Sequence, residues 1–141
     1  VDDFNNIYKL KRGINISYKN DGKNKYLIYG IENRIEQIIA NLLDNAISFS
    51  DDNKDVIVQV SKSQDDKVYI TILDEGRGFK EKDTNKIFKR FYSNRPDKFG
   101  QHSGLGLNIV KNLVDLHNAT IKASNRQDKK GASMEIEFPK V

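Results

Sequence analysis

The 141-residue sequence contains no cysteine, which excludes a disulfide framework and a thiolate metal site and is compatible with a reducing compartment. It also lacks any apolar run close to the roughly 20 residues of a transmembrane helix, and its first residues are not those of a secretion signal. The first residue is Val1 and not methionine, so we expect a fragment of a longer protein. The 37% hydrophobic and 31% charged residues are typical of a globular chain, and the length predicts a single domain over 1–141.

The positive charge of the sequence is concentrated in one segment. The formal net charge is +4, and residues 80–100 contain seven basic residues against three acidic ones, so this segment accounts for the whole excess. A local positive charge is typical of a site for a polyanion, although a solvated lysine-rich loop is an equally ordinary explanation. A basic nucleic-acid-binding domain is a further alternative. Because no zinc-finger spacing or basic aromatic RNA-binding motif is present, nucleic acid is not the partner that we expect.

The hydrophobic pattern predicts an α+β fold of two layers. In 31–49 and 105–117 the apolar residues recur at helical spacing and define one buried face of each helix. In 133–138 they alternate with polar residues, as in a strand with one buried face. Because strands and helices do not alternate strictly, we expect a two-layer α/β sandwich, a mixed sheet with helices on one face. The segment 75–103 is expected to be irregular apart from one helical turn near 85–91. The first two expected strands are joined by a turn, and the next two form a hairpin through 62–66. The expected strands are 14–18, 26–30, 56–60, 67–74, 120–124 and 133–138.

Two asparagines lie one turn apart on the helix expected at 31–49. Asn41 and Asn45 fall on the same side, at the edge of the buried face, where their amide groups need hydrogen-bond partners. Each could bond to a neighbouring backbone group, which is the common outcome for a single asparagine, whereas two in register favour a ligand. An amide oxygen suits Mg²⁺, which keeps water and phosphate oxygens as its other ligands.

The stretch LDEGRGF (73–79) ends a predicted strand with an acid and then places two glycines. Asp74 followed by Gly76 and Gly78 could simply form a turn. The alternative is a site in which the carboxylate accepts a hydrogen bond from the amino group of adenine and the glycines let the backbone pass close to the ring. Guanine presents a carbonyl oxygen at that position, so this alternative predicts ATP and not GTP.

The stretch GQHSGLGLNIVKNLV (100–114) places two glycines at the start of a predicted helix. It lacks the third glycine of a dinucleotide fingerprint and the Lys-Ser/Thr ending of a P-loop, so neither of those motifs is indicated. A flexible turn before a core helix is one interpretation. The other is phosphate binding by the unpaired amides at 104–107, with Arg90 and Arg95 as charged partners.

Taken in order along the chain, these motifs resemble the catalytic ATP-binding domain of sensor histidine kinases, in the superfamily that includes gyrase, heat-shock chaperone and mismatch-repair ATPases. The resemblance covers roughly 30–139, and the stretch FYSNRPDKFGQHSGLGL especially resembles membrane-bound two-component kinases. The matching segments are RIEQIIANLLDNAISFS (34–50) as the N box, DEGRGF (74–79) as the first glycine box, IFKRFY (87–92) as the F box, GQHSGLGLNIVKNLVDLH (100–117) as the second glycine box and GASMEIEFP (131–139) as the terminal strand.

The resemblance implies a site for ATP and Mg²⁺ in a mostly antiparallel sheet of about five strands with about three helices, under a mobile ATP lid at 80–103. Asn45 would bind the metal, Asn41 would serve catalysis near the triphosphate, and Asp74 would bind adenine in a pocket shaped by Gly76 and Gly78. The groups near the phosphates would be the side chain of Arg90, which would also serve catalysis, the side chain of Ser103, and the amides of Gly104, Leu105, Gly106 and Leu107.

The sequence departs from the family pattern at three positions. Ser48 stands where many members have a lysine or arginine near the phosphates, so the cations of the lid would have to compensate. Ile31 replaces the usual aspartate after a glycine, so we expect a weak helix cap. Asn118 replaces a glycine, and asparagine is the residue that next best tolerates a left-handed backbone.

The two histidines bear on the reaction that the resemblance implies. In this family the phosphate acceptor is a histidine on a separate dimerising hairpin, and neither His102 nor His117 has its sequence context. We therefore expect a catalytic domain without its dimerisation and phosphoacceptor domain, with little turnover alone, and with His117 in a packing role. The implied setting is a monomeric fragment of a homodimeric kinase that acts on a response regulator, on the cytoplasmic side of a bacterial inner membrane. The alternative is a non-catalytic nucleotide-sensing module, which Ser48 favours.

Overall fold

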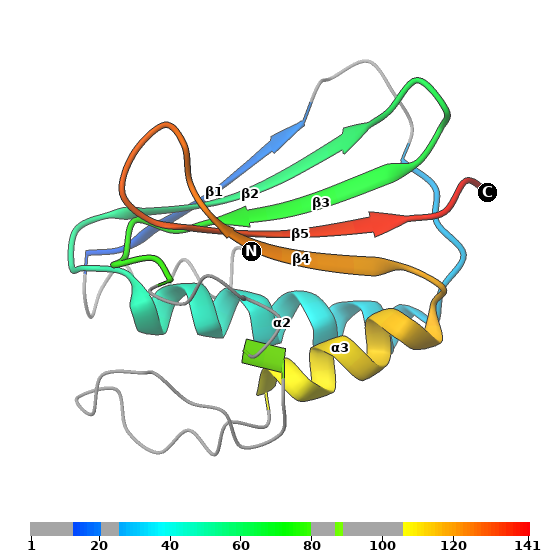
Figure 1. The fold of residues 1–141 in the computed structure, drawn as a ribbon, viewed down its shortest axis with the longest axis horizontal. Helices are drawn as coiled ribbons and strands as arrows, with labels where there is room; N and C mark the ends of the chain where they lie inside the picture. Colours follow the sequence, from blue (N-terminus) through cyan, green and yellow to red (C-terminus); the bar gives the residue numbers. More distant parts are fainter. Residues whose placement is uncertain (1–12, 21–25, 80–86, 89–105) are drawn as a thin grey trace.

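The structure, a computed structural model, places five strands in one sheet and two helices against one face of that sheet (Figure 1). It describes residues 13–20, 26–79, 87–88 and 106–141. The strand order is β1-β2-β3-β5-β4, so β3 is central. The strands are β1 (Asn15–Asn20), β2 (Asp55–Lys62), β3 (Val68–Leu73), β4 (Thr120–Asn125) and β5 (Ala132–Phe138), and the helices are α2 (Glu32–Phe49) and α3 (Gly106–Leu116).

The pairing of the strands confirms the predicted mixed, mostly antiparallel sheet. Strand β1 pairs with β2 in parallel, whereas the β2–β3, β3–β5 and β4–β5 pairs are antiparallel. The predicted hairpin between β2 and β3 is confirmed, and Asp66 in its turn has a positive φ of 64°. Two helices lie in the described part of the chain where about three were expected. Of the helical turn predicted near 85–91, only residues 87–88 lie in that part.

The prediction of a second strand at 26–30 is wrong. Residues 26–31 form no strand in the described structure, and they connect the sheet layer to the helix layer (Figure 1). Tyr26 and Ile28 pack against the core while Leu27 and Tyr29 are 63% and 73% exposed. The residues therefore alternate as in a strand, but β1 pairs with β2 instead of with this segment.

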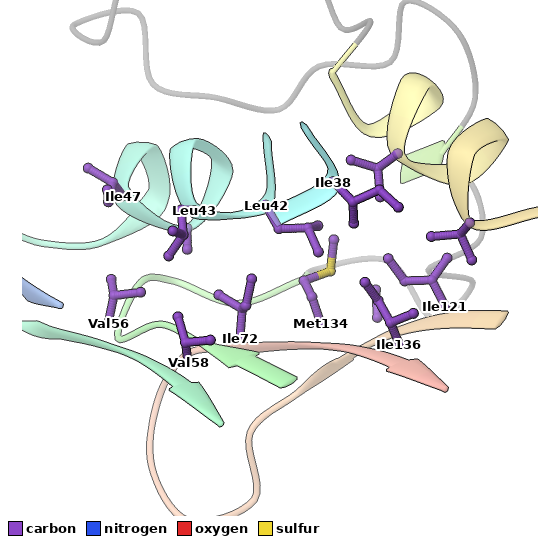
Figure 2. Close-up of a cluster of buried hydrophobic side chains, with 14 of the residues drawn as sticks. Ile38, Leu42, Leu43, Ile47, Val56, Val58, Ile72, Ile121, Met134 and Ile136 are labelled. Atoms are coloured by element: carbon purple, nitrogen blue, oxygen red, sulfur yellow. The ribbon is translucent and has the colours of Figure 1, made fainter. Parts of the chain in front are cut away.

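The hydrophobic core fills the space between the sheet and the helices (Figure 2). Alternate residues of the strands point toward α2 and α3, and full burial of one such aliphatic side chain contributes about 1.5–3 kcal/mol. The residues labelled in Figure 2 are Ile38, Leu42, Leu43 and Ile47 of α2, Val56 and Val58 of β2, Ile72 of β3, Ile121 of β4, and Met134 and Ile136 of β5.

The opposite face of the sheet carries a row of polar side chains. Lys19, Gln59, Thr71, Glu135 and Lys122 follow one another across the five strands in direct register. Opposite charges next to each other on a sheet stabilise the pairing modestly, and a hydrophilic face needs no covering layer. Both helices are therefore found on the same side, as the sequence predicted.

The start of α2 is held by the end of α3. Ile31, the residue before α2, makes no side-chain cap hydrogen bond, which confirms the predicted weak cap. Its backbone N–H instead donates to Nε2 of His117 at 3.1 Å, while Nδ1 of the same ring lies 2.7 Å from the Leu113 carbonyl oxygen. Both contacts are satisfied when the neutral imidazole carries its proton on Nδ1. His117 is 8% exposed, so its predicted packing role is confirmed, and Asn118 has the expected positive φ of 56°.

Candidate functional site

Asp74, directly after the central strand β3, is a buried charged side chain held by the backbone of two other segments. It is 3% exposed, and its Oδ1 accepts hydrogen bonds from the backbone N–H groups of Gly76 at 2.9 Å and Ala132 at 3.0 Å. Its own N–H donates to the Ala132 carbonyl oxygen at 3.0 Å. Among the described residues, no hydrogen bond reaches Oδ2. The fold thus uses one carboxylate oxygen and leaves the other for a further donor.

Burial raises the pKa of Asp74 above its ordinary value, because the charged carboxylate loses hydration. The N–H groups of Gly76 and Ala132 and the positive charge of Arg126 act in the opposite direction and only partly compensate. A buried acid with a perturbed pKa at a strand end is typical of a functional site, since a purely structural position is more often apolar.

Close backbone contacts require glycine on both sides of Asp74. A Cβ atom on Gly76 would lie 2.2 Å from the carbonyl oxygen of Phe49, the last residue of α2, so the strand end lies directly against the helix end. A Cβ atom on Gly131 would lie 2.0 Å from the Asp74 carbonyl oxygen. Both distances are far inside van der Waals contact, and any larger residue would displace the acid.

The residues after Gly76 are held by the end of strand β4. Gly78 has a φ of +74° and lies beside the Asn125 amide. The Phe79 N–H donates to Asn125 Oδ1 at 2.6 Å, and Asn125 Nδ2 donates to the Phe79 carbonyl oxygen at 3.1 Å. The backbone that follows Asp74 is therefore fixed at both Gly76 and Phe79.

Helix α2 brings its two asparagines toward the same end of the sheet. Asn45 lies one helical turn before Phe49, the residue that contacts Gly76, and it is only 4% exposed. Asn41 is half-buried and lies one turn further back. Ser48 donates its hydroxyl to the Asp44 carbonyl oxygen at 2.8 Å, so this side chain is used within the helix. The structure thus places Asn45 one helical turn from Phe49, and Phe49 contacts the glycine two residues after Asp74.

Helix α3 begins beside the residues of the F box. Its first residue is Gly106, where a Cβ atom would have nothing within 4 Å, and Leu107 packs against the core. Asn108 Nδ2 donates to the Phe88 carbonyl oxygen at 3.2 Å, and the Ile87 and Phe88 side chains are buried. Of the predicted site residues, Arg90, Ser103, Gly104 and Leu105 lie outside the described residues, as does Arg95.

The residues that hold Asp74 from the other side were missed by the sequence analysis. They are Arg126, Gly131 and Ala132, in and after the connection between β4 and β5. A backbone N–H such as that of Ala132 leaves no mark in the sequence. Only Gly131, at the start of the terminal strand segment, offered a signal that a close approach was required.

A mixed sheet with both helices on one face and a buried carboxylate at the end of its central strand defines a two-layer α+β domain with a candidate binding site at that strand end. Residues 30–141 match the family described as "Histidine kinase-, DNA gyrase B-, and HSP90-like ATPase", and the chain belongs to this family. Membership confirms the resemblance that the sequence motifs indicated, and an ATPase domain of this kind binds ATP.

Individual relatives agree with this assignment. The chain is 36% identical over 138 residues to the sensor protein ChvG of Agrobacterium fabrum, covering 93% of this chain and 23% of ChvG. Its fold matches that of the mycobacterial sensor histidine kinase MprB, with a TM-score of 0.80 at 23% identity over 98% of this chain and 90% of that chain. It also matches full-length ShkA in complex with AMPPNP, with a TM-score of 0.82 at 24% identity over 97% of this chain and 28% of that chain. The chain spans less than a quarter of the length of the curated relatives that it matches first.

Two properties of the described ranges concern membranes and metals. No helix there is both long and apolar enough to cross a membrane. No cluster of three or more histidine, aspartate or glutamate side chains there could hold a metal ion without other ligands.

Proposed function

We propose that this chain is the catalytic ATP-binding domain of a sensor histidine kinase and that it transfers the γ-phosphoryl group of ATP to a histidine on the dimerisation domain of its parent protein. The observation that carries the proposal is the buried Asp74, whose Oδ1 is held by two backbone N–H groups while no described residue donates to its Oδ2. The family membership of residues 30–141 supports the same function.

Adenine recognition follows from the chemistry of Asp74. A carboxylate can only accept hydrogen bonds, and the exocyclic amino group of adenine is a donor. Guanine would place its carbonyl oxygen against Asp74, and two buried acceptors facing each other would cost about 1–3 kcal/mol. We infer that Gly76 and Gly78 let the backbone approach the flat face of the base. ATP is therefore preferred to GTP.

Mg²⁺ fits the side-chain amide oxygens of α2 as ligands. We assign its protein ligand to Asn45, whose oxygen is a hard donor on a buried helix face. Since the described residues offer no acidic cluster, phosphate oxygens and water would complete the coordination. When bound, the ion neutralises negative charge on the triphosphate. Asn41, one turn away, is assigned to the same end of the nucleotide.

The phosphates are assigned to the start of α3. The unpaired N–H groups at a helix start and the positive end of its dipole attract anions, and α3 begins at Gly106. Catalysis in this class depends on positioning and charge neutralisation, so the assigned residues need no nucleophile among them. The phosphate-binding groups that we propose are the side chains of Arg90 and Ser103 and the amides of Gly104, Leu105, Gly106 and Leu107.

The wider setting is part of the same proposal. The parent protein would be a homodimeric, membrane-anchored sensor with this domain in the cytoplasm, and its phosphohistidine would supply a response regulator. The relative ChvG is a sensor protein, which agrees with this role. The isolated chain would be a monomer that binds ATP and hydrolyses it slowly, because the acceptor histidine lies in another domain.

Two experiments test the kinase proposal. Calorimetric titration of ATP and GTP, with and without Mg²⁺, should give tighter binding of ATP and a clear gain with the metal. A separately expressed acceptor hairpin of the parent protein, mixed with this chain and radiolabelled ATP, should be phosphorylated on histidine. Asn45→Ala should abolish the Mg²⁺-dependent transfer, whereas Asn33→Ala, at an exposed asparagine of the same helix, should leave it unchanged. ATP binding by the wild type without any transfer would refute the kinase role.

That last outcome would favour a nucleotide-sensing module without transfer activity. One observation supports this second candidate: the Ser48 hydroxyl bonds to the Asp44 carbonyl oxygen, so no cation is available at that position for the phosphates. A sensor would still bind ATP through Asp74. Its Asn45→Ala variant would lose affinity for magnesium-ATP but would have no transfer to lose.

A further inference from the structure

Arg126 is a buried arginine that contacts the backbone of Asp74. It directly follows β4, and its side chain is only 3% exposed. Its Nη1 donates to the Asp74 main-chain carbonyl oxygen at 3.1 Å, across 52 residues of sequence. Its Nε and Nη2 donate to the two carboxylate oxygens of Asp128 at 3.0 and 2.8 Å. Burying a guanidinium costs hydration free energy, and the hydrogen bonds to Asp128 and to the Asp74 carbonyl oxygen compensate for that cost.

The packing around the Asp74 carbonyl leaves no freedom at this point. The backbone of Gly131 lies against both groups: a Cβ atom added to it would be 2.0 Å from the Asp74 carbonyl oxygen and 3.1 Å from Arg126 Cδ. The Arg126 N–H donates to the Gly131 carbonyl oxygen at 2.9 Å, which closes the connection between β4 and β5 on itself. Together with the bonds from Ala132, these contacts hold the N–H, the carbonyl oxygen and Oδ1 of Asp74.

We propose that Arg126 is a positioning residue for nucleotide selectivity: by holding the Asp74 carbonyl against Gly131, it fixes the carboxylate as a charged acceptor that presents Oδ2 to the base. The inference rests on the proposed adenine-binding role of Asp74. It makes the connection between β4 and β5, which contributes no predicted ligand contact, a determinant of the preference for ATP over GTP.

The positive charge of Arg126 favours the ionised form of the Asp74 carboxyl. Among the described residues, the charged group that acts on Asp74 is Arg126, which itself pairs with Asp128. The neighbouring Glu75 pairs with Lys129 at 3.4 Å. Burial raises the pKa of Asp74, and the positive charge of Arg126 opposes that rise. Without the guanidinium, the carboxyl would take up a proton at higher pH. A protonated carboxyl can donate to the carbonyl oxygen of guanine, which a carboxylate cannot do.

The test compares the nucleotide selectivity of three variants at neutral and mildly acidic pH. Arg126→Met keeps the long stem that packs beside Gly131 but removes the donors and the charge. Arg126→Lys keeps the charge, but one ammonium group cannot bond to the Asp74 carbonyl and to both oxygens of Asp128 with the geometry of a guanidinium. Lys129→Met is the matched control, because it removes a neighbouring cation that pairs with Glu75 and not with Asp74.

Calorimetry with ATP and GTP should give the following results. Arg126→Met is expected to bind ATP roughly 10-fold more weakly and to lose most of its selectivity over GTP as the pH falls. Arg126→Lys is expected to bind ATP about 3-fold more weakly with the pH profile of the wild type, because the charge remains. Lys129→Met should match the wild type for both nucleotides.

Three results would overturn the inference. The first is a folded Arg126→Met variant with wild-type affinities for both nucleotides at both pH values. The second is an equal loss of ATP and GTP binding that does not change with pH, which would indicate a purely structural arginine. The third applies if Arg126→Met does not fold: it is an Arg126→Lys variant with the wild-type affinities for ATP and GTP at both pH values. A wild-type chain that binds no ATP would instead refute the proposed function, so the two failures are distinguishable.

Discussion

Asp74→Asn removes the charge of the buried acid without changing its size. In the folded protein the asparagine oxygen is expected to take the position of Oδ1, because the N–H groups of Gly76 and Ala132 both require an acceptor there. The amide nitrogen then occupies the position of Oδ2 and turns a hydrogen-bond donor toward the ligand. The amino group of adenine, also a donor, would meet it without a partner.

The magnitude follows from that exchange of acceptor for donor. A hydrogen bond to a charged acceptor contributes about 1.5–3 kcal/mol, so ATP affinity should fall by roughly 10- to 100-fold. GTP should lose less or gain, since its carbonyl oxygen can accept from the new amide. The free energy of unfolding at neutral pH should fall by no more than about 1 kcal/mol, because the variant keeps both backbone bonds and no longer buries a charge.

Calorimetric titration of both nucleotides, with chemical denaturation of each protein, measures these effects together. Asp115→Asn is the control, since Asp115 lies on α3 and pairs with the exposed Lys111. An Asp74→Asn variant that is folded and binds ATP as tightly as the wild type would refute the reasoning, because Oδ2 would then not contact the base.

Three further predictions concern stability and pH. Gly131→Ala should lower the free energy of unfolding by about 2–4 kcal/mol in urea denaturation, because its Cβ atom would lie 2.0 Å from a carbonyl oxygen. The control Gly106→Ala, with nothing within 4 Å of the new atom, should be neutral or stabilising by up to about 1 kcal/mol. Equal losses of stability in the two variants would contradict the close packing at Gly131. His117→Ala should cost about 1–3 kcal/mol and speed hydrogen exchange of the Ile31 amide, which loses its acceptor, and unchanged exchange would be inconsistent with the cap. The hydrogen bond from Arg126 lowers the pKa of Asp128 from 3.8 to about 2, so the contribution of this pair to stability is complete above pH 3.8 and is lost as the pH falls toward 2. The free energy of unfolding of Asp128→Asn should therefore change less with pH in that window than that of the wild type. The same pH dependence in both proteins would argue against this pair.

The sequence predicted the elements whose burial imposes a period. Helices α2 and α3 and strands β2 to β5 were located within one or two residues, because each presents one apolar face to the core. The segment 26–30 has the same alternation and yet forms no strand. Alternation reports which side chains face the core, but it does not report whether a second backbone is in place to pair. The parallel pairing of β1 with β2 was not predicted for the same reason.

The candidate site divides along similar lines. Asp74 and Gly76 could be proposed from the sequence because an acid at a strand end followed by glycine is a local signal. The donors that hold the acid were not found, since the Ala132 N–H has no side-chain signature and Arg126 looks like any surface arginine in the sequence. Buried contacts between residues more than fifty positions apart depend on the assembled sheet.

The polar face of the sheet has a practical consequence in a chain without cysteine. A thiol introduced at Lys122, which is exposed in the middle of β4, would be the single reactive sulfur of the molecule. A fluorophore, a spin label or a surface tether attached there would project away from both helices. Distances to a nucleotide analogue could then be measured in solution, with no need to remove native residues first.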